Sequence, residues 1–412
     1  MAFFRGDEVP KELRFLKRVF ADHYRKGSVD APYRFARREW GFFPFGGKMM
    51  FRHISFNRKS ELDGFFLDTV PMHAYYSVAY YGAPSLQPMG DKFKTWMGAD
   101  LIFDLDSDHL PDAESMSYTE QLEQVKEEVK RLLFEFILDD LGLPEEYTRL
   151  YFSGGRGYHV HVRDPDVLPL DSRARRNIVD YITGRGLDLD KLFPKITVSV
   201  NTKYGSHKEK RKFPKDQKGG WISKIYTGRD RLISDLAARD KKGKIDLLLW
   251  LGKKGKIKLG KDMCRSILGH EKNFHRIVGT SRFDIFERNQ QLEMFLQLVV
   301  AYSSIHLSGE TDEPVTTDIK RLIRCPGSLH GKTGFKVVEV PIDRVDDFDP
   351  LRDAVVLPDD PVKVNVVRPV EQYLGSEDHS LQPGEHTVPT YLAYFLVARR
   401  LALLPGSDPD QR

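Results

Sequence analysis

The sequence predicts an α/β (α+β) fold in which mixed or antiparallel sheets are flanked by helices, with a smaller helical insertion. Four observations predict it. Residues 101–108 have the pattern of a buried strand that ends in aspartates, and residues 149–162 that of two strands joined by a glycine turn. Apolar residues recur at helical spacing in residues 10–25 and 117–142, and the apolar segment at 286–305 indicates the helical insertion.

Length and composition limit the class of protein. At 412 residues the chain can bury a large core and form two or three units. Its net charge of +4 is too small to identify a nucleic-acid partner, so the local distribution of charge has to decide. Cys264 and Cys325 are the only cysteines, which excludes a disulfide framework and a paired-cysteine metal site. With no signal sequence and no apolar run near ~18 residues, we expect a soluble cytoplasmic protein.

The segment LIFDLDSD at residues 101–108 is the first candidate metal site. In a strand, Asp104 and Asp106 project from one face about 7 Å apart. The same geometry points Phe103 and Leu105 into the core. Two adjacent carboxylates repel each other unless a cation lies between them, and magnesium accepts such oxygen ligands. The competing interpretation is a turn, in which Asp and Ser are common.

The segment RLYFSGGRGYHVHV at residues 149–162 is a candidate phosphate site. Three glycines within five positions remove side-chain bulk, so backbone N–H groups can approach an anion closely. Ser153 can donate a hydrogen bond, Arg156 can bind a phosphate through two N–H groups, and His159 can add a further contact. The alternative is a tight hairpin with incidental polar residues.

A third block, at residues 310–334, combines carboxylates with basic and hydroxyl side chains in a loop rich in glycine and proline. This composition indicates an anion site, and the alternative is a helix with a basic solvent-facing side. Upstream, Glu39 and Arg52 lie beside two short predicted strands and are weaker candidates, because charged residues near a hairpin are commonly solvated. The candidate residues of the third block are Asp312 or Asp318, Arg321, Arg324, Ser328, His330 and Lys332.

Residues 203–218 carry a dense run of basic residues with aromatic residues between them. Such a pattern suits a single nucleic-acid strand, whose phosphates are neutralised and whose bases stack on the rings. The alternative is a solvated flexible loop. The basic residues are Lys203, Lys208, Lys210, Arg211, Lys212, Lys215 and Lys218, and the rings are Tyr204, His207 and Phe213.

The motifs FDLDSD, SGGRGYHVHV and DIKRLIRCPGSLHGKTG, in this order, resemble those of the archaeo-eukaryotic primase family, most closely the archaeal small (catalytic) subunit. The resemblance runs from about residue 38 to about residue 353. It implies a DNA primase, a nucleotidyltransferase that synthesises short primers on single-stranded DNA during replication. We therefore expect a primase catalytic domain at residues 1–355, in which about 225–305 is a mostly helical insertion. A C-terminal extension with an amphipathic helix is expected at 356–412.

The resemblance also implies roles for individual residues. Asp104 and Asp106 match the metal-binding aspartates of the family. Asp312 matches the third catalytic aspartate, with Asp318 as the alternative. Glu39 and Arg52 match an upstream segment of the family less closely. The residues expected to contact the nucleotide are Ser153, Arg156, His159, Arg324, Ser328, His330 and Lys332.

The expected cofactors are Mg²⁺ or Mn²⁺, two ions that lie about 3.5–4 Å apart in such sites. The expected partners are a primase large subunit, in a heterodimer, a single-stranded DNA template and NTPs or dNTPs, with no membrane involved. Many members of the family carry a zinc-binding knuckle after the first motif. Because residues 109–116 here hold one histidine and no cysteine, we expect no structural zinc.

Other functions are compatible with the sequence. One is a primase-polymerase or repair polymerase that prefers dNTPs, because sugar selectivity depends on the shape of the pocket around the 2′-hydroxyl. Another is a non-catalytic protein that binds single-stranded nucleic acid, although such a protein has no need for carboxylates facing a phosphate site. A two-metal nuclease is disfavoured by the two separate phosphate sites around Ser153 and His330.

Overall fold

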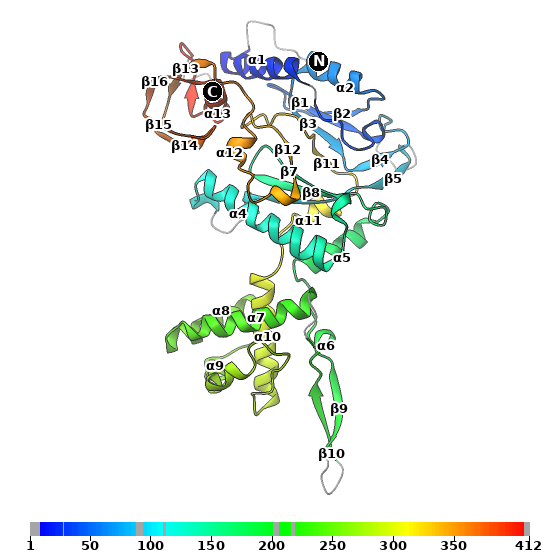
Figure 1. Cartoon of the computed structure of the whole chain (residues 1–412), viewed down its shortest axis with the longest axis vertical. Helices are drawn as coiled ribbons and strands as arrows, with labels where there is room; N and C mark the ends of the chain where they lie inside the picture. The colour runs from blue at the N-terminus through cyan, green and yellow to red at the C-terminus, as the bar shows by residue number, and fades with distance from the viewer. Residues whose placement is uncertain are drawn as a thin grey trace. The chain divides into compact units, whose positions relative to one another are not determined.

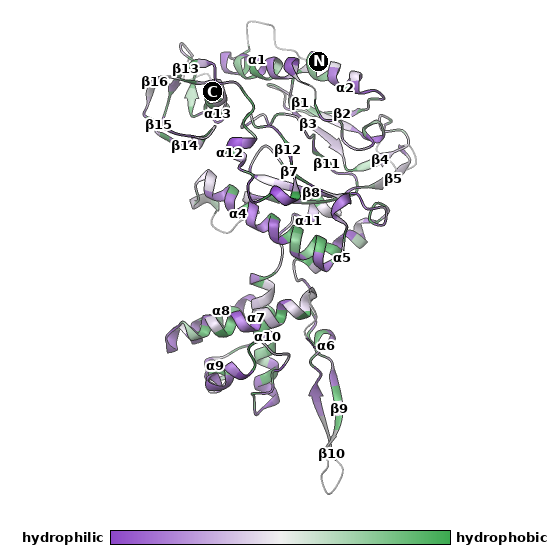
Figure 2. Ribbon diagram, viewed as in Figure 1, coloured by the Kyte–Doolittle hydropathy of each residue, from purple (hydrophilic) through white to green (hydrophobic). Residues whose placement is uncertain are grey.

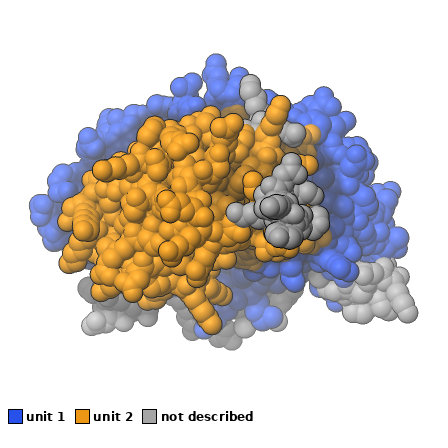
Figure 3. Space-filling model, turned by 90° about the horizontal axis from the view of Figure 1, so that it is seen from below, with its two compact units in different colours: residues 1–133, 143–176, 311–412 blue, residues 134–142, 177–310 orange. Residues whose placement is uncertain are grey.

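The computed structural model describes residues 9–27, 29–87, 94–109, 113–200, 206–215 and 219–407 of the chain. The chain forms two compact units, which Figure 3 colours blue and orange. The first unit takes residues 1–133, 143–176 and 311–412, and the second takes residues 134–142 and 177–310. The second unit is therefore wider than the insertion expected at about 225–305, and residues 356–412 belong to the first unit.

Two four-stranded sheets form the centre of the first unit (Figure 1). One has the order β11-β3-β1-β2, with β1 (Trp40–Pro44), β2 (Phe51–Ile54), β3 (Pro71–Ser77) and β11 (Leu322–Arg324). The other has the order β12-β7-β8-β6, with β6 (Leu101–Asp106), β7 (Thr148–Phe152), β8 (Gly157–Val162) and β12 (Val338–Val340). The strand pairings described in both sheets are antiparallel, and together with the flanking helices they confirm the predicted fold class. A further antiparallel pair is formed by β4 (Ala79–Tyr81) and β5 (Trp96–Ala99).

Helices cover the two sheets of the first unit. α1 (Lys11–Lys26) and α2 (Lys59–Thr69) lie on one side, and α4 (Tyr118–Lys130) lies on the other (Figure 1). α4 begins with a capping box, in which the Ser117 hydroxyl accepts the Glu120 N–H and the Glu120 carboxylate accepts the Ser117 N–H. It continues as a π-helix over Arg131–Asp140. The other helices that begin in this unit are α5 (Ser172–Ile182), α11 (Glu313–Thr317), α12 (Pro350–Asp353) and α13 (Thr390–Ala398).

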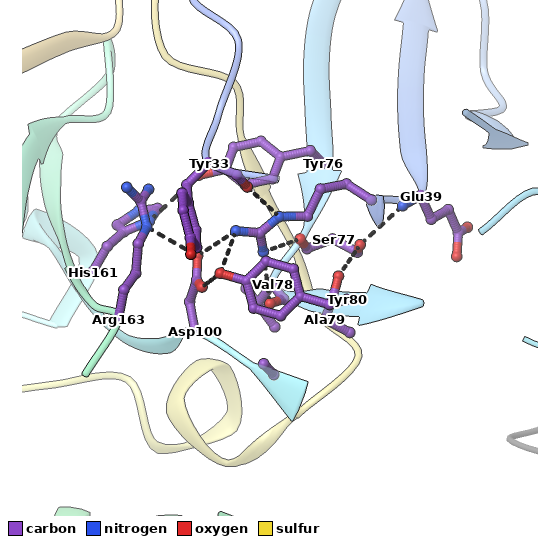
Figure 4. A network of polar contacts seen from close by, with 12 residues as sticks. Tyr33, Glu39, Tyr76, Ser77, Val78, Ala79, Tyr80, Asp100, His161 and Arg163 are labelled. Carbon is purple, nitrogen blue, oxygen red and sulfur yellow. Dashed lines mark hydrogen bonds and ion pairs between the residues drawn. The ribbon is translucent and has the colours of Figure 1, made fainter. Parts of the chain in front are cut away.

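A buried ion pair holds the residue that precedes β6. Arg38 Nη2 lies 2.8 Å from Asp100 Oδ2, and both side chains are fully buried. The guanidinium also donates to the carbonyls of Ser77 and Val78, at 2.8 and 2.7 Å. Tyr80 donates its hydroxyl to the other carboxylate oxygen of Asp100 (Figure 4). Because a buried charge pair needs such additional hydrogen bonds to offset its desolvation, the network fixes where β6 begins.

The C-terminal residues pack on the rest of the first unit. They form a sheet of β13 (Pro361–Val366), β16 (Gly384–Pro389) and β17 (Ala402–Leu403), and a pair of β14 (Val370–Leu374) and β15 (Glu377–Leu381). In α13, every residue from position 392 to 397 is buried, so the helix is not the amphipathic one that we expected. Tyr394 stacks on Phe20 of α1 with ring centroids 5.0 Å apart.

The second unit is a helical bundle with a β-hairpin. Its helices are α6 (Leu189–Leu192), α7 (Gly220–Ala237), α8 (Lys241–Lys254), α9 (Lys261–Leu268) and α10 (Asn289–His306), and its hairpin is β9 (Lys195–Val200) with β10 (Ser206–Arg211). Figure 2 shows hydrophobic and hydrophilic residues alternating along these helices, as expected for helices that bury one side. Within the described ranges, no helix is long and apolar enough to cross a membrane.

Candidate active site

β6 presents two aspartates on one face. The side chains of Asp104 and Asp106 are 24% and 36% exposed, whereas Phe103 and Leu105 are buried. Strand alternation therefore turns both carboxylates toward solvent and the apolar side chains into the core. In the antiparallel register Asp104 lies opposite His159 of β8, and His159 Nε2 is 3.3 Å from Asp104 Oδ1. The structure thus places His159, which we expected to contact the nucleotide, against a candidate metal ligand.

α11 brings a third acidic residue to β6. Asp312 immediately precedes this helix, and its N–H donates to the Asp104 carbonyl at 2.9 Å. Asp318 lies at the other end of the helix, where it is exposed and its carboxylate accepts the Lys320 N–H at 2.9 Å. The structure therefore brings Asp312 next to Asp104, while the carboxylate of Asp318 closes a turn at the far end of α11.

Arg324 and His73 connect the first sheet to this acidic face. Arg324 ends β11, and its Nη1 lies 2.9 Å from Nδ1 of His73 in β3. The Gly331 N–H also donates to this Nδ1, at 3.3 Å, so His73 accepts here and carries its proton on Nε2. Burial lowers the pKa of Arg324, and acidic groups nearby, the Asp104 and Asp106 carboxylates among them, oppose that shift. The sequence did not reveal His73, because a single histidine in an apolar strand has no spacing signal.

The turn between β7 and β8 needs its glycines for close approach. Gly154 has a φ of +75°, and a Cβ at this position would come within 2.8 Å of the Cβ of His330. A Cβ on Gly157 would lie 2.1 Å from the carbonyl oxygen of Leu105 in β6. The turn therefore packs its backbone directly against β6 and against the segment that carries His330.

Ser153 and Arg156, the predicted phosphate ligands of this turn, both contact neighbouring groups. Ser153 Oγ accepts the Gly155 N–H at 3.3 Å, an arrangement that leaves the hydroxyl proton available to a ligand. Arg156 Nη2 lies 2.6 Å from Asp108 Oδ1 and 3.8 Å from Asp106 Oδ1. The Arg156 side chain is 39% exposed, so its guanidinium stands at the solvent edge of the β6 carboxylates.

The loop after β11 holds His330 in a fixed position. The His330 N–H donates to the Phe335 carbonyl and the Gly334 N–H donates to the His330 carbonyl, both at 2.8 Å. Thr333 Oγ1 donates to the Gly154 carbonyl at 2.6 Å and so joins this loop to the glycine turn. We refer to residues 328–334 as the His330 loop.

The surroundings of His330 are electropositive. Burial lowers the pKa of His330 well below its ordinary value, and the groups that lower it further are Arg324, His73, Lys332 and Arg156. The cationic side chains around this neutral imidazole repel one another, and a bound anion relieves that repulsion. Because the Asp104 and Asp106 carboxylates raise the pKa of Arg324, the cationic groups around His330 lie near the acidic face. This combination suits a nucleoside triphosphate with divalent cations.

Two tyrosine hydroxyls support these loops. Tyr118 of α4 donates to the Gly155 carbonyl at 2.5 Å, and Tyr394 of α13 donates to the Gly331 carbonyl at 2.9 Å. Arg399, which follows α13, lies with its Cζ 4.8 Å from the ring centroid of Tyr118. The sequence did not predict either tyrosine, since both lie outside the three motifs and a buried tyrosine is ordinarily part of a core.

Comparison with known proteins identifies the family. The family model described as DNA primase small subunit matches residues 103–343, more than half of the chain. The DNA primase small subunit PriS of Methanothrix thermoacetophila is 40% identical over 398 residues, which cover 95% of this chain and 98% of the relative. The chain belongs to the DNA primase small subunit family. PriS of Methanococcoides burtonii is 39% identical over 396 residues, which cover 95% of this chain and 98% of the relative. PriS of Thermoplasma volcanium is 38% identical over 386 residues, which cover 93% of this chain and 95% of the relative.

Family membership confirms the resemblance carried by the three motifs. The matches with these relatives extend beyond residue 343, where the family model ends. Most of the C-terminal residues that pack on the first unit are therefore part of what this chain shares with its relatives.

Three of the residues expected at the primase site have internal partners. Glu39 is fully buried, and its carboxylate lies 2.6 Å from Lys94 Nζ and 3.0 Å from Arg52 Nε. Ser328 is 1% exposed, and its Oγ donates to the Cys325 carbonyl at 2.7 Å. Glu39 is thus tied to Arg52 and Lys94, and Ser328 to its own turn. Contact of these residues with a nucleotide stays a prediction.

Part of the basic stretch predicted to bind the template lies on β10 of the hairpin. Lys203, Tyr204 and Lys218 lie outside the described residues. Arg211 is 4% exposed and lies 2.7 Å from carboxylates of both α6 and α10. Phe213 packs against the hydrophobic core of the second unit. These two side chains therefore stabilise the unit, and the prediction that they face a nucleic-acid strand was wrong.

Cation binding by Asp104, Asp106 and Asp312 stays a prediction. In the described part of the chain, no three His, Cys, Asp or Glu side chains are gathered where they could hold one ion together. The donor set still fits hard divalent cations such as Mg²⁺ or Mn²⁺, because it offers only oxygen ligands, two of them on one strand face. The expected absence of structural zinc also stays a prediction, since residues 110–112 are not among those described.

Proposed function

We propose that this chain is the catalytic subunit of a DNA primase, a DNA-directed RNA polymerase that synthesises short primers on single-stranded DNA during replication. The observation that carries the proposal is the meeting of the acidic face of β6 and α11 with the electropositive surroundings of His330. A nucleoside triphosphate and its divalent cations are complementary in charge to these two surfaces. The name of the relatives, DNA primase small subunit, supports the same function.

The acidic face supplies the cation ligands. Asp104, Asp106 and Asp312 would hold Mg²⁺ or Mn²⁺, which when bound neutralise charge on the attacking and leaving oxygens of a nucleotidyl transfer. His159, 3.3 Å from the Asp104 carboxylate, keeps that carboxylate oriented. The backbone hydrogen bond from Asp312 to the Asp104 carbonyl keeps the third acidic residue beside β6.

The electropositive side holds the triphosphate. Arg324, His330 and Lys332 would bind its oxygens, and Arg156 would join them by exchanging its contact with Asp108 for phosphate oxygens. These contacts hold the α-phosphate in line with the 3′-oxygen of the growing primer. They also stabilise the negative charge that develops on the leaving pyrophosphate.

The proposed partners follow from the same reaction. A large subunit would form a heterodimer with this chain, a role supported by the words "small subunit" in the names of the relatives. The template would be single-stranded DNA, and the substrates would be NTPs or dNTPs.

The test is nucleotide incorporation on a single-stranded DNA template. The purified chain, alone and with its large-subunit partner, is incubated with NTPs or dNTPs and with magnesium or manganese. We expect metal-dependent products that a D104A/D106A variant does not make, although this variant binds the template as well as the wild type does. Products from dNTPs alone would favour a primase-polymerase or repair polymerase. Tight template binding without products under any combination would overturn the proposal in favour of a non-catalytic binding protein.

A further inference from the structure

A cavity of about 540 Å³ on the second unit is rimmed by lysines. Three segments of this unit line it: residues 184–189, residues 254–258 at the end of α8, and residues 297–305 of α10. The charged side chains among the lining residues are Lys254, Lys256 and Lys258, and none of the described residues that line the cavity is acidic. We call it the lysine cavity.

The three lysines carry uncompensated positive charge. All of them are exposed, and none has a carboxylate partner among the described residues. Lys244 of the same unit, by contrast, contacts Glu271 at 2.5 Å. Residues 241–261, which include the cavity lysines, contain eight lysines and a single aspartate. Like charges that line one cavity repel one another, and a bound anion relieves the repulsion.

The rest of the lining suits a ligand with apolar and anionic parts. Leu187, Ile257, Val300 and Ile305 give the cavity an apolar wall, and Ile305 is 40% exposed. Gly186 leaves one side open, since a Cβ there would have no atom within 4 Å. The cavity therefore offers an apolar surface to a base or sugar and a cationic rim to a phosphate.

An exposed tryptophan lies close to the lysine cavity. Trp250 precedes Lys254 by one turn of α8, so the two side chains share a helix face. Its ring is 41% exposed and lies 6.4 Å from that of His306, the residue next to Ile305 of the cavity wall. An exposed aromatic ring beside lysines is the combination by which proteins bind single-stranded nucleic acid without sequence preference.

A second cavity of this unit provides a contrast. It has a similar volume, about 560 Å³, but four acidic side chains line it together with four basic ones. One of the basic residues is Arg211, which is already held by two carboxylates. The charges that line the second cavity balance, so this cavity has no net attraction for a polyanion. The charges that line the lysine cavity are all positive.

We propose that the lysine cavity binds the phosphodiester backbone of single-stranded nucleic acid, with Trp250 stacking on a base. This inference rests on the proposed function, because a primer-synthesising enzyme has to hold a single strand. It adds a binding site on the second unit that is separate from the acidic face and from the His330 loop.

Binding to a fluorescently labelled oligothymidylate tests the proposal. Fluorescence anisotropy is measured on the full chain without nucleotides or divalent ions, over a series of salt concentrations. The variant K254A/K256A/K258A is compared with K241A/K242A/K272A, which removes the same charge from exposed lysines of the same unit. We expect the cavity variant to bind about tenfold or more weakly. The slope of log K against log salt should fall by about 2, because each phosphate contact on a single strand contributes about 0.7. Equal losses in the two variants, or no loss in either, would overturn the proposal.

Two further variants and a competition experiment distinguish loss of positive charge from misfolding, and nucleic acid from an acidic protein segment as the ligand. The variant K254R/K256R/K258R should bind as the wild type does, and a loss as large as that of the alanine variant would overturn the proposal. W250A should weaken binding roughly fivefold or more without changing the salt slope. If polyglutamate displaces the oligonucleotide as effectively as unlabelled oligothymidylate, an acidic protein segment is the better occupant and the proposal fails.

Primer synthesis by the same samples keeps the two proposals distinguishable. A wild type that binds through the cavity lysines but makes no products contradicts the proposed function and leaves the lysine cavity standing. A wild type that makes products, with a cavity variant that binds the oligonucleotide as well as the matched control does, contradicts the lysine cavity alone.

Discussion

Among single residues, Asp312 and Asp318 provide the sharpest test of the proposed chemistry. Asp312→Ala should lower nucleotide incorporation at least about 100-fold. Loss of a residue that only supports a metal ligand lowers metal affinity or activity about 10–100-fold, and loss of a ligand itself should cost at least as much. Asp318→Ala should leave incorporation nearly unchanged, because its carboxylate only accepts the Lys320 N–H at the end of α11. Incorporation is measured at saturating template and metal, and thermal melting checks that both variants fold. Comparable losses in the two variants would contradict the assignment of Asp312.

What the sequence could predict about the site depended on how local each residue's partners are. Asp104 and Asp106 were visible because strand alternation alone places them on one face, and the structure shows that alternation. His73 was not visible, since its partner Arg324 lies 251 positions away in the chain. For Ser328 the sequence did not show that its hydroxyl donates to the Cys325 carbonyl of its own turn.

The support that α13 gives to the His330 loop leads to a prediction about this helix. Tyr394→Phe removes the hydroxyl that donates to the Gly331 carbonyl at 2.9 Å and leaves the ring in place. A loop released at this point holds the neighbouring His330 less firmly, so the KM for the nucleotide should rise roughly five- to tenfold, the equivalent of one hydrogen bond. Steady-state kinetics should show a much smaller change in kcat.

A matched variant separates this effect from a general loss of stability. Tyr226 is also buried and donates its hydroxyl to a backbone carbonyl, that of Pro214, at 2.5 Å, but it lies in the second unit. Both Tyr→Phe changes should lower the free energy of unfolding by about 1 kcal/mol. Only Tyr394→Phe should raise the nucleotide KM, and an equal rise in both variants would show that α13 has no specific role at the site.

Element prediction succeeded where a pattern depends on few long-range contacts. The strand at β6 and the strand–turn–strand of β7 and β8 follow from apolar runs and glycines, and the structure contains them. α13 was predicted to be amphipathic, yet residues 392–397 are buried on every side because α1 and the C-terminal strands cover it. No periodicity within a helix reveals how many neighbours will surround it.

For the whole molecule, the boundaries between the two units could not be predicted from the sequence, for a physical reason. The chain passes from the first unit to the second inside helices, within the π-helix Arg131–Asp140 and within α5. A boundary inside a helix has no cluster of glycine, proline or polar residues to mark it. The apolar core of the second unit was detectable, and the segments that lead into it were not.

Buried histidines should set the acid limit of the stability of the first unit. Burial lowers the pKa of His73 to about 3, and burial also lowers the pKa of His161 well below its ordinary value. In the unfolded chain both groups titrate near about 6.5, so below that pH the unfolded state binds protons that the folded state does not. Their contribution is therefore complete above about pH 6.5 and is lost as the pH falls, by about 1.4 kcal/mol per pH unit for each histidine.

Urea denaturation between about pH 7 and about pH 5 measures this dependence. His161→Gln should make the fall in the free energy of unfolding shallower by about 1.4 kcal/mol per pH unit, because the variant no longer has this titrating group. His275→Gln, at an exposed position of the second unit, should leave the slope unchanged. If both variants lost stability with falling pH at the same rate as the wild type, His161 would not be a source of the acid sensitivity. In that case the acid sensitivity of the fold would have to arise from groups other than His161.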